Sequence, residues 1–157
     1  MEKVTDLIKS SDLFIGLPEE KIETVLAIGE VKVFGAGENI IAEGELSGEL
    51  YLVQEGLVEV LVPSGAVADV AGAPQLSSVV QLGRGQIFGE MALVDRGVRS
   101  ATVRCVEDGT TLFVIERDAF RELCESDHHI GHVVMRNLAR DLSFKLRHRN
   151  LRSLTSR

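Results

Sequence analysis

The chain has 157 residues, of which 45% are hydrophobic, and a formal net charge of −7 at pH 7. This length and apolar content predict one globular domain with its own core and exclude general disorder. The acidic first residues exclude a secretory signal, and no apolar run approaches the ~20 residues of a membrane span. We therefore expect a cytoplasmic protein in which Cys105 and Cys124, which lack metal-type spacing, are reduced thiols.

The charge is distributed unevenly along the chain. Residues 142–157 contain five basic residues and no acidic one. Because the whole chain carries −7 and this end carries +5, residues 1–141 carry −12. An acidic body argues against nonspecific binding to nucleic acid. The basic end fits a solvated helix face, or a contact surface for an acidic partner or a second copy.

Helices are predicted in the first thirty residues. Ser11-Asp12 and Pro18-Glu19-Glu20 both have the composition of helix starts. From Val31 the apolar period shortens, and glycines separate short alternating or apolar runs. These runs predict strands at 31–34, 49–56, 57–62, 78–83, 101–107 and 109–116. Such spacing indicates a β-sandwich or jelly roll, and the weakly patterned residues 63–78 are predicted to be a long hairpin connection.

The helical period returns after Ile115. A short helix is predicted at Arg117–Glu125, and a longer one is predicted to start near Ser126-Asp127, a good N-cap pair. The longer helix has a one-sided apolar stripe of Ile130, Val133, Val134, Leu138, Leu142 and Leu146, with Leu151 as a candidate at its end. Because this stripe is too long for one small barrel to cover, we predict a homodimer through the C-terminal helix.

These elements predict a single domain over residues 1–157. Helices at 1–29 and 117–155 would flank a β core at about 30–116. His128 and His132 lie one helical turn apart, but no cysteine or third ligand accompanies them. We therefore predict no metal site.

The segment Gly83–Val103 carries the clearest chemistry. It combines a glycine-flanked turn, a short helix that opens at Gly89-Glu90, and Arg99 directly before a strand. The amides of a helix N-terminus favour an anion, and a guanidinium can donate to two phosphate oxygens. The carboxylate of Glu90 can accept a hydrogen bond from a sugar hydroxyl. This combination favours a small phosphorylated sugar, although Glu90 and Arg99 could also form a structural ion pair with each other.

The order of these segments resembles the cyclic nucleotide-binding domain family. The resemblance covers about residues 12–150 and is carried by three features. They are the glycine-punctuated hairpin IIAEGELSGELYLVQEGLVEVLV at 40–62, the cassette FGEMAL at 88–93 with RSATV at 99–103, and the long C-terminal helix. The resemblance implies a mainly β fold, a jelly roll or double-stranded β-helix, with N-terminal helices and a long C-terminal lid helix.

The resemblance also implies roles for the matched residues. Gly89 would let the backbone approach the ligand, and Glu90 would accept a hydrogen bond from the ribose 2′-hydroxyl. Met91 and Ala92 would offer backbone N–H groups to the exocyclic oxygens of the cyclic phosphate.

Arg99 would neutralise that phosphate with help from Ser100, and Ala101 completes the ligand-binding set on this side. Kinase-type members have a proline before the arginine, whereas this chain has Val98, so the turn into Arg99 is less rigidly preset.

Contact with the base is predicted to come from the C-terminal helix. Catabolite activator proteins use a Thr-Ser pair there, and a rough alignment places Lys145 and Leu146 at those positions. Leu142 or Leu146 is therefore predicted to pack on the purine. Ser100 is compatible with either adenine or guanine, and we favour cyclic AMP over cyclic GMP.

The resemblance thus implies a noncatalytic sensor with no catalytic residue, no metal and no cofactor besides its cyclic nucleotide ligand. Its C-terminal helix would move on binding and signal to an effector protein in trans. Direct DNA binding is not expected, because only seven residues, LRSLTSR, follow Asn150. The alternatives are a ligand-independent dimerising interaction scaffold, or a regulatory fragment of a larger transcription factor or effector.

Overall fold

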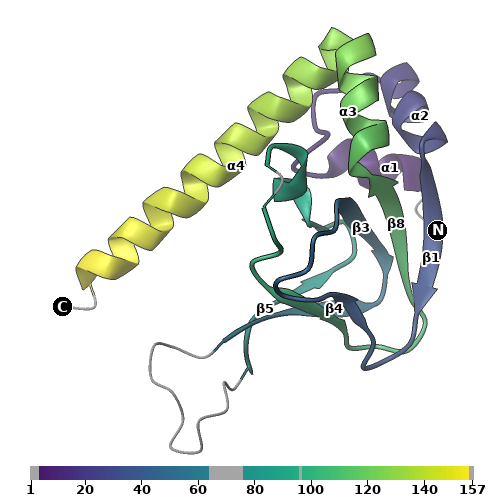
Figure 1. Cartoon of the computed structure of the whole chain (residues 1–157). Coiled ribbons are helices and arrows are strands. Elements are labelled where there is room, and N and C mark those ends of the chain that lie inside the picture. Colours follow the sequence, from purple (N-terminus) through teal and green to yellow (C-terminus); the bar gives the residue numbers. More distant parts are fainter. Residues whose placement is uncertain (1–3, 64–75, 96, 156–157) are drawn as a thin grey trace, which may run out of the picture.

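The structure is a computed structural model that describes residues 4–63, 76–95 and 97–155. These residues form two four-stranded antiparallel sheets with helices at one end, in a jelly-roll arrangement (Figure 1). The first sheet has the order β1 (Gly29–Phe34), β8 (Thr110–Glu116), β3 (Glu49–Glu55) and β6 (Ile87–Phe88). The second has the order β2 (Asn39–Ile41), β7 (Thr102–Cys105), β4 (Leu57–Pro63) and β5 (Leu76–Gly83). The predicted fold class is confirmed.

All six predicted strands are present, and two further strands were not predicted. β2 and β6 have three and two residues, too few to show an alternating pattern. β4 and β5 pair as an antiparallel hairpin, in which Leu57 is opposite Gly83 at one end and Pro63 is opposite Leu76 at the other. Most of the connection predicted at 63–78 therefore lies outside the described residues.

The N-terminal helices are α1 (Val4–Ser10) and α2 (Glu19–Ala27), with Pro18 directly before α2 as predicted. The prediction that Ser11-Asp12 starts a helix is wrong. The Ser11 hydroxyl donates to the Ile8 carbonyl at 2.7 Å, and residues 11–16 form a turn. A serine hydroxyl that bonds backward satisfies a carbonyl at a helix end and cannot cap a following helix.

The C-terminal helices are α3 (Arg117–Ser126) and α4 (His128–Thr155). Asp127 is the N-cap of α4, since its carboxylate accepts a hydrogen bond from the Ile130 N–H at 3.2 Å. The same carboxylate lies 2.6 Å from the Lys21 ammonium of α2. The hydrogen bond from Lys21, with the Ile130 N–H, lowers the pKa of Asp127. The junction of α3 and α4 is thereby fixed to α2.

The apolar stripe of α4 divides into a buried and an exposed part. Ile130, Val134 and Leu138 are buried in a core shared with the N-terminal helices and the first sheet. Leu142 is partly buried against that core, whereas Leu146 is 60% exposed. Beyond the core, α4 extends away from the sheets (Figure 1).

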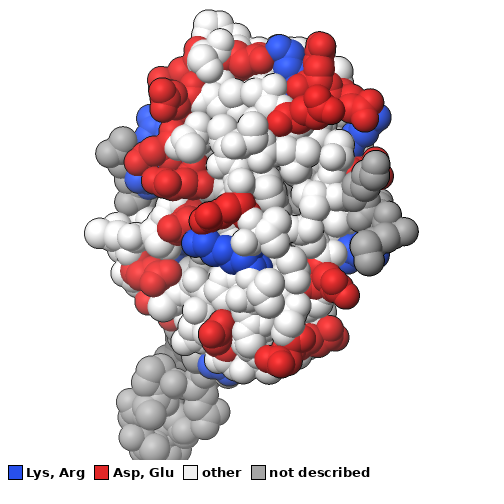
Figure 2. All heavy atoms as spheres, turned by 90° about the vertical axis from the view of Figure 1, so that its right-hand side faces the viewer, with Lys and Arg blue, Asp and Glu red and all other residues white. Residues whose placement is uncertain are grey.

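A second core fills the space between the two sheets. It consists of buried side chains from both, namely Ile41, Tyr51, Val53, Val58, Phe88, Val103, Leu112 and Val114. On the face that carries α2 and β1, acidic side chains surround a small basic area (Figure 2). This face agrees with the acidic body inferred from the sequence.

Asn137 ties α4 to the turn between α1 and α2. Its buried side-chain amide donates to the Leu13 carbonyl at 2.9 Å and to the Ile15 carbonyl at 2.8 Å. We expect Asn137→Ala to lower the free energy of unfolding by about 2–4 kcal/mol, because two acceptors lose their donor. Urea unfolding measures this change. Asn39→Ala at the exposed Asn39 is the control and should stay within about 0.5 kcal/mol of the parent; equal losses would contradict the assignment.

Candidate ligand-binding site

A cavity of about 500 Å³ opens between the β4–β5 hairpin, the residues after β6, and the segment before β7. This volume lies within the range of small-molecule pockets. Apolar side chains line most of it: Ile41, Val60, Leu82 and Val103 come from the second sheet, and Phe88 comes from β6 of the first. Its charged and hydroxyl-bearing lining residues are Glu90, Asp95, Arg99, Ser100 and Lys145.

Gly89, whose backbone adopts the left-handed conformation, positions the part of the cavity wall formed by the residues after β6. β6 pairs with β3, where Phe88 stacks on Tyr51 with ring centroids 4.9 Å apart. Burial, with the nearby Glu49 carboxylate, raises the pKa of Tyr51 to about 12. Gly89 then adopts φ 82° and leads into the 3₁₀ helix η1 (Glu90–Leu93). The short helix predicted to open at Gly89-Glu90 is therefore present.

Gly89 is required here for two reasons. Its positive φ disfavours any residue with a Cβ atom. An added Cβ would also lie 2.8 Å from the Glu49 carbonyl oxygen and 3.1 Å from Arg99 Nη1. Within the turn, the Ala92 N–H donates to the Gly89 carbonyl at 3.3 Å. The amide of Ala92 therefore has an internal acceptor in this conformation.

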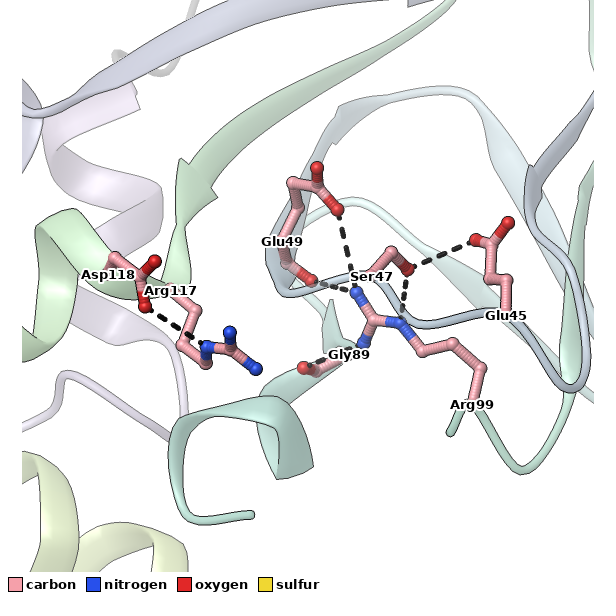
Figure 3. Close-up of polar contacts among 7 residues, drawn as sticks. All are labelled: Glu45, Ser47, Glu49, Gly89, Arg99, Arg117 and Asp118. Atoms are coloured by element: carbon pink, nitrogen blue, oxygen red, sulfur yellow. Dashed lines mark hydrogen bonds and ion pairs between the residues drawn. The ribbon is translucent and has the colours of Figure 1, made fainter. Parts of the chain in front are cut away.

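The guanidinium of Arg99 is buried at the edge of the cavity and is only 8% exposed. It donates from Nε to Ser47 Oγ at 2.8 Å and from Nη2 to the Glu49 carbonyl at 2.6 Å (Figure 3). A third bond runs from Nη1 to the Gly89 carbonyl at 3.3 Å, and the Glu49 carboxylate lies 3.8 Å from Nη2. Each terminal nitrogen has a second N–H that these three bonds do not use.

The backbone of Arg99 is held as firmly as its side chain. Its N–H donates to the Glu45 carbonyl at 2.9 Å, and its carbonyl accepts from the Gly44 N–H at 2.8 Å. Ser47 in turn donates to the Glu45 carboxylate at 3.1 Å. Arg99 therefore joins the segment 44–49 to the turn after β6.

Sequence reasoning missed Ser47 and Glu49 as partners of Arg99. Both lie in the hairpin segment that supported the family resemblance, but no role was assigned to them. They could have been found from the needs of the arginine, because a buried guanidinium requires several acceptors. The segment with Ser47 and Glu49 offers hydroxyl and carboxylate oxygens close to a strand.

Glu90 has a different partner from Arg99. Its side chain is 14% exposed, and Oε1 lies 3.4 Å from the ammonium of Lys145 on α4. Lys145 also pairs with Asp141 at 2.9 Å, one helical turn earlier. Burial lowers the pKa of Lys145, but Asp141 and Glu90 outweigh this effect and raise it overall. The predicted alternative, an ion pair between Glu90 and Arg99, is not what the structure has, since each is paired elsewhere.

The structure brings most of the predicted site residues together. Seven of them line the cavity: Gly89, Glu90, Met91, Ala92, Arg99, Ser100 and Ala101. Leu142 and Leu146 are not among its lining residues, because Leu142 packs against the helical core and Leu146 is exposed. Among the α4 residues whose side chains the structure describes, Lys145 is the one that lines the cavity.

The described residues offer no candidate for two other kinds of site. Among residues 4–63, 76–95 and 97–155, no group of three or more His, Cys, Asp or Glu side chains is arranged to hold a metal ion. Over the same ranges, no helix combines the length and apolar character needed to cross a membrane.

The geometry of Gly89 gives a stability prediction. We expect Gly89→Ala to lower the free energy of unfolding by about 2–5 kcal/mol, from the left-handed backbone and the contact with the Glu49 carbonyl. Gly109→Ala is the matched control, because Gly109 has φ 80° and open space where the Cβ would lie. It should cost only about 1–2 kcal/mol. Equal losses in urea unfolding would rule out a contribution from the contact.

Comparison with known proteins places this site in a family. The chain is 33% identical over 144 residues to the cyclic AMP receptor protein of Thermus thermophilus, covering 92% of this chain and 61% of that protein. It is 30% identical over 121 residues to cGMP-dependent protein kinase 2 of Homo sapiens, covering 77% of this chain and 15% of the kinase. The chain thus spans less than two thirds of the length of either relative.

Comparison with solved structures identifies the same kind of protein. The crystal structure of the Thermus thermophilus catabolite activator protein matches with a TM-score of 0.78 and 33% identity, over 93% of this chain and 63% of that chain. Residues 31–127, more than half of this chain, match the family described as the cyclic nucleotide-binding domain. With Gly89, Glu90 and Arg99 inside the matched range, the chain belongs to the cyclic nucleotide-binding domain family.

Proposed function

We propose that the chain is a noncatalytic sensor of a cyclic purine mononucleotide, with cyclic AMP preferred over cyclic GMP. The observation that carries this proposal is that Arg99 and Glu90 line one cavity without neutralising each other. One supplies guanidinium donors and the other a carboxylate acceptor. These are the groups that a cyclic phosphate and a ribose hydroxyl require.

The proposed contacts follow from this placement. The second N–H groups of the Arg99 terminal nitrogens would donate to the phosphate, with Ser100 beside them in the lining. The phosphate would also compete with the Gly89 carbonyl for the Ala92 N–H, whose bond to that carbonyl is 3.3 Å long. Glu90 would accept a hydrogen bond from the 2′-hydroxyl, and the Met91 amide lies in the same wall.

The base would lie against the β4–β5 hairpin. Val60, Val80 and Leu82 supply apolar lining there, whereas Leu142 and Leu146 of α4 lie elsewhere. This placement replaces the purine contact expected from α4. The preference for cyclic AMP agrees with the name of the relative that is 33% identical over 144 residues, a cyclic AMP receptor protein.

Signalling is proposed to occur through α4. Its first half is fixed by Asp127 and Asn137, while Lys145 in its second half reaches the ligand cavity. Phe144 and Leu146 are 65% and 60% exposed, which supports a contact of α4 with a second copy in a homodimer. An effector protein would then respond in trans to the position of this helix.

The role of Arg99 is tested by replacing it. We expect Arg99→Leu to weaken cyclic AMP binding by about 2–4 kcal/mol, because the phosphate would be left without its guanidinium. Isothermal titration calorimetry measures the change, and unfolding curves confirm that the variant is folded. Arg104→Leu, on the neighbouring strand β7 and paired with Glu59, is the matched control.

Arg99→Leu also removes three internal hydrogen bonds. Arg99→Lys is therefore a second variant, which keeps the positive charge but lacks the planar guanidinium that can donate to two phosphate oxygens. It should bind with intermediate affinity. Unchanged affinity in both folded variants would eliminate the proposed phosphate contact.

The ligand preference is tested by thermal unfolding with a panel of cyclic nucleotides. A ligand at 100 times its Kd stabilises the folded state by about 2.7 kcal/mol. For a chain of this size, that corresponds to a rise in Tm of roughly 5–11 °C. We expect a larger rise with cyclic AMP than with cyclic GMP at equal concentration. A flat response to every nucleotide would favour the ligand-independent scaffold instead.

A further inference from the structure

Lys145 connects helix α4 to the candidate ligand cavity, which its side chain lines. We propose that Lys145 is a positioning residue that orients the Glu90 carboxylate for the ligand hydroxyl and thereby couples ligand binding to the position of α4. This inference rests on the proposed function, since it assigns a regulatory contact to the same site.

The contacts of Lys145 allow it to act together with a ligand rather than against it. Its ammonium lies 2.9 Å from Asp141 and 3.4 Å from Oε1 of Glu90. A carboxylate has two acceptor oxygens, so Oε2 of Glu90 can accept from a hydroxyl while Oε1 faces Lys145. Asp141 holds the lysine side chain in place from one helical turn earlier.

Lys145 and Glu90 also lie in the wall that separates the ligand cavity from a second cavity. Both residues line a second cavity of about 430 Å³ between α4 and the turn that joins β5 to β6. Leu82 and Ile87 are the other two residues common to both cavities. Without the lysine side chain, Glu90 would face the second cavity, where water could compete for its oxygens.

Lys145 lies in the part of α4 that is not packed on the core, so its ion pair with Glu90 affects the position of that part of the helix. Core packing of the helix weakens at Leu142, and Phe144 and Leu146 in the next turn are exposed. The ion pair with Glu90 is therefore a tether between η1 and the part of α4 that lies beyond the core. By linkage, if this tether strengthens ligand binding, the ligand strengthens the tether by the same factor.

The test is a cycle of four dissociation constants, for parent and Lys145→Met with cyclic AMP and 2′-deoxy cyclic AMP. The 2′-deoxy ligand lacks the hydroxyl that Glu90 is proposed to bind. Since exposed ion pairs are weak, we expect Lys145→Met to lower cyclic AMP affinity roughly three- to fivefold more than 2′-deoxy affinity. Long-range attraction to the phosphate would affect both ligands equally, so the ratio isolates the effect through Glu90.

Two further variants sharpen the result. Lys145→Arg keeps the charge and the donors and should retain the parent ratio. Arg147→Met removes an exposed charge from the same helix, outside the cavity lining, and its two dissociation constants should equal those of the parent. Hydrogen exchange of amides 139–148 provides a readout on α4: cyclic AMP should slow it in the parent and slow it less in Lys145→Met.

The outcomes separate this inference from the proposed function. If the parent binds neither ligand, the proposed function fails. If the parent binds cyclic AMP but Lys145→Met changes both affinities equally, raises them, or leaves them unchanged, then Lys145 does not orient Glu90 and the inference is overturned. A ratio change that Arg147→Met reproduces would overturn it as well.

Discussion

The burial of one guanidinium organises this site. Taking the charge of Arg99 out of water is costly, and the cost is offset only if its donors meet acceptors in good geometry. Those acceptors come from Ser47 just before β3, from Glu49 at the start of β3, and from Gly89 after β6. Segments distant in the sequence therefore have one arrangement that satisfies the arginine, and the cavity takes its shape from that arrangement.

The two charged groups of the site, Arg99 and Glu90, are paired with different partners rather than with each other. If Arg99 and Glu90 were paired with each other, a ligand would have to break a poorly screened ion pair before it could bind either group. In the structure, Glu49 lies beside Arg99, and Lys145 lies beside Glu90. Arg99 and Glu90 therefore both line the cavity with their charges partly offset by separate partners. Side chains that are held by fixed partners in this way lose less conformational entropy when they bind a ligand, which reduces the cost of the proposed binding.

The sequence predicts those parts of the molecule that depend on local pattern. The strands β3, β4 and β8, the start of α4 at Asp127 and the turn at Gly89 all have clear periodicity or residue chemistry. β2 and β6 are too short for any pattern, and the hydroxyl of Ser11 could bond forward or backward. The expected contact of Leu142 or Leu146 with the purine rests on a rough alignment of the C-terminal helix, and an alignment does not give the path of that helix relative to the barrel. That path depends on tertiary packing, which also decides which acceptors surround Arg99.

The anchoring of α4 at one end turns the helix into a lever. Asn137 and Asp127 fix it near the core, and the helix continues to Thr155, where it projects beyond the sheets (Figure 1). At 1.5 Å per residue, the arm from Leu138 to Thr155 is about 25 Å long. A pivot of about 10° at Leu138 would swing the tip by about 4 Å, a displacement on the scale of a side chain. If α4 pivots in this way, as the proposed function requires, a shift of about 2 Å at Lys145 beside η1 would accompany that larger displacement at the tip.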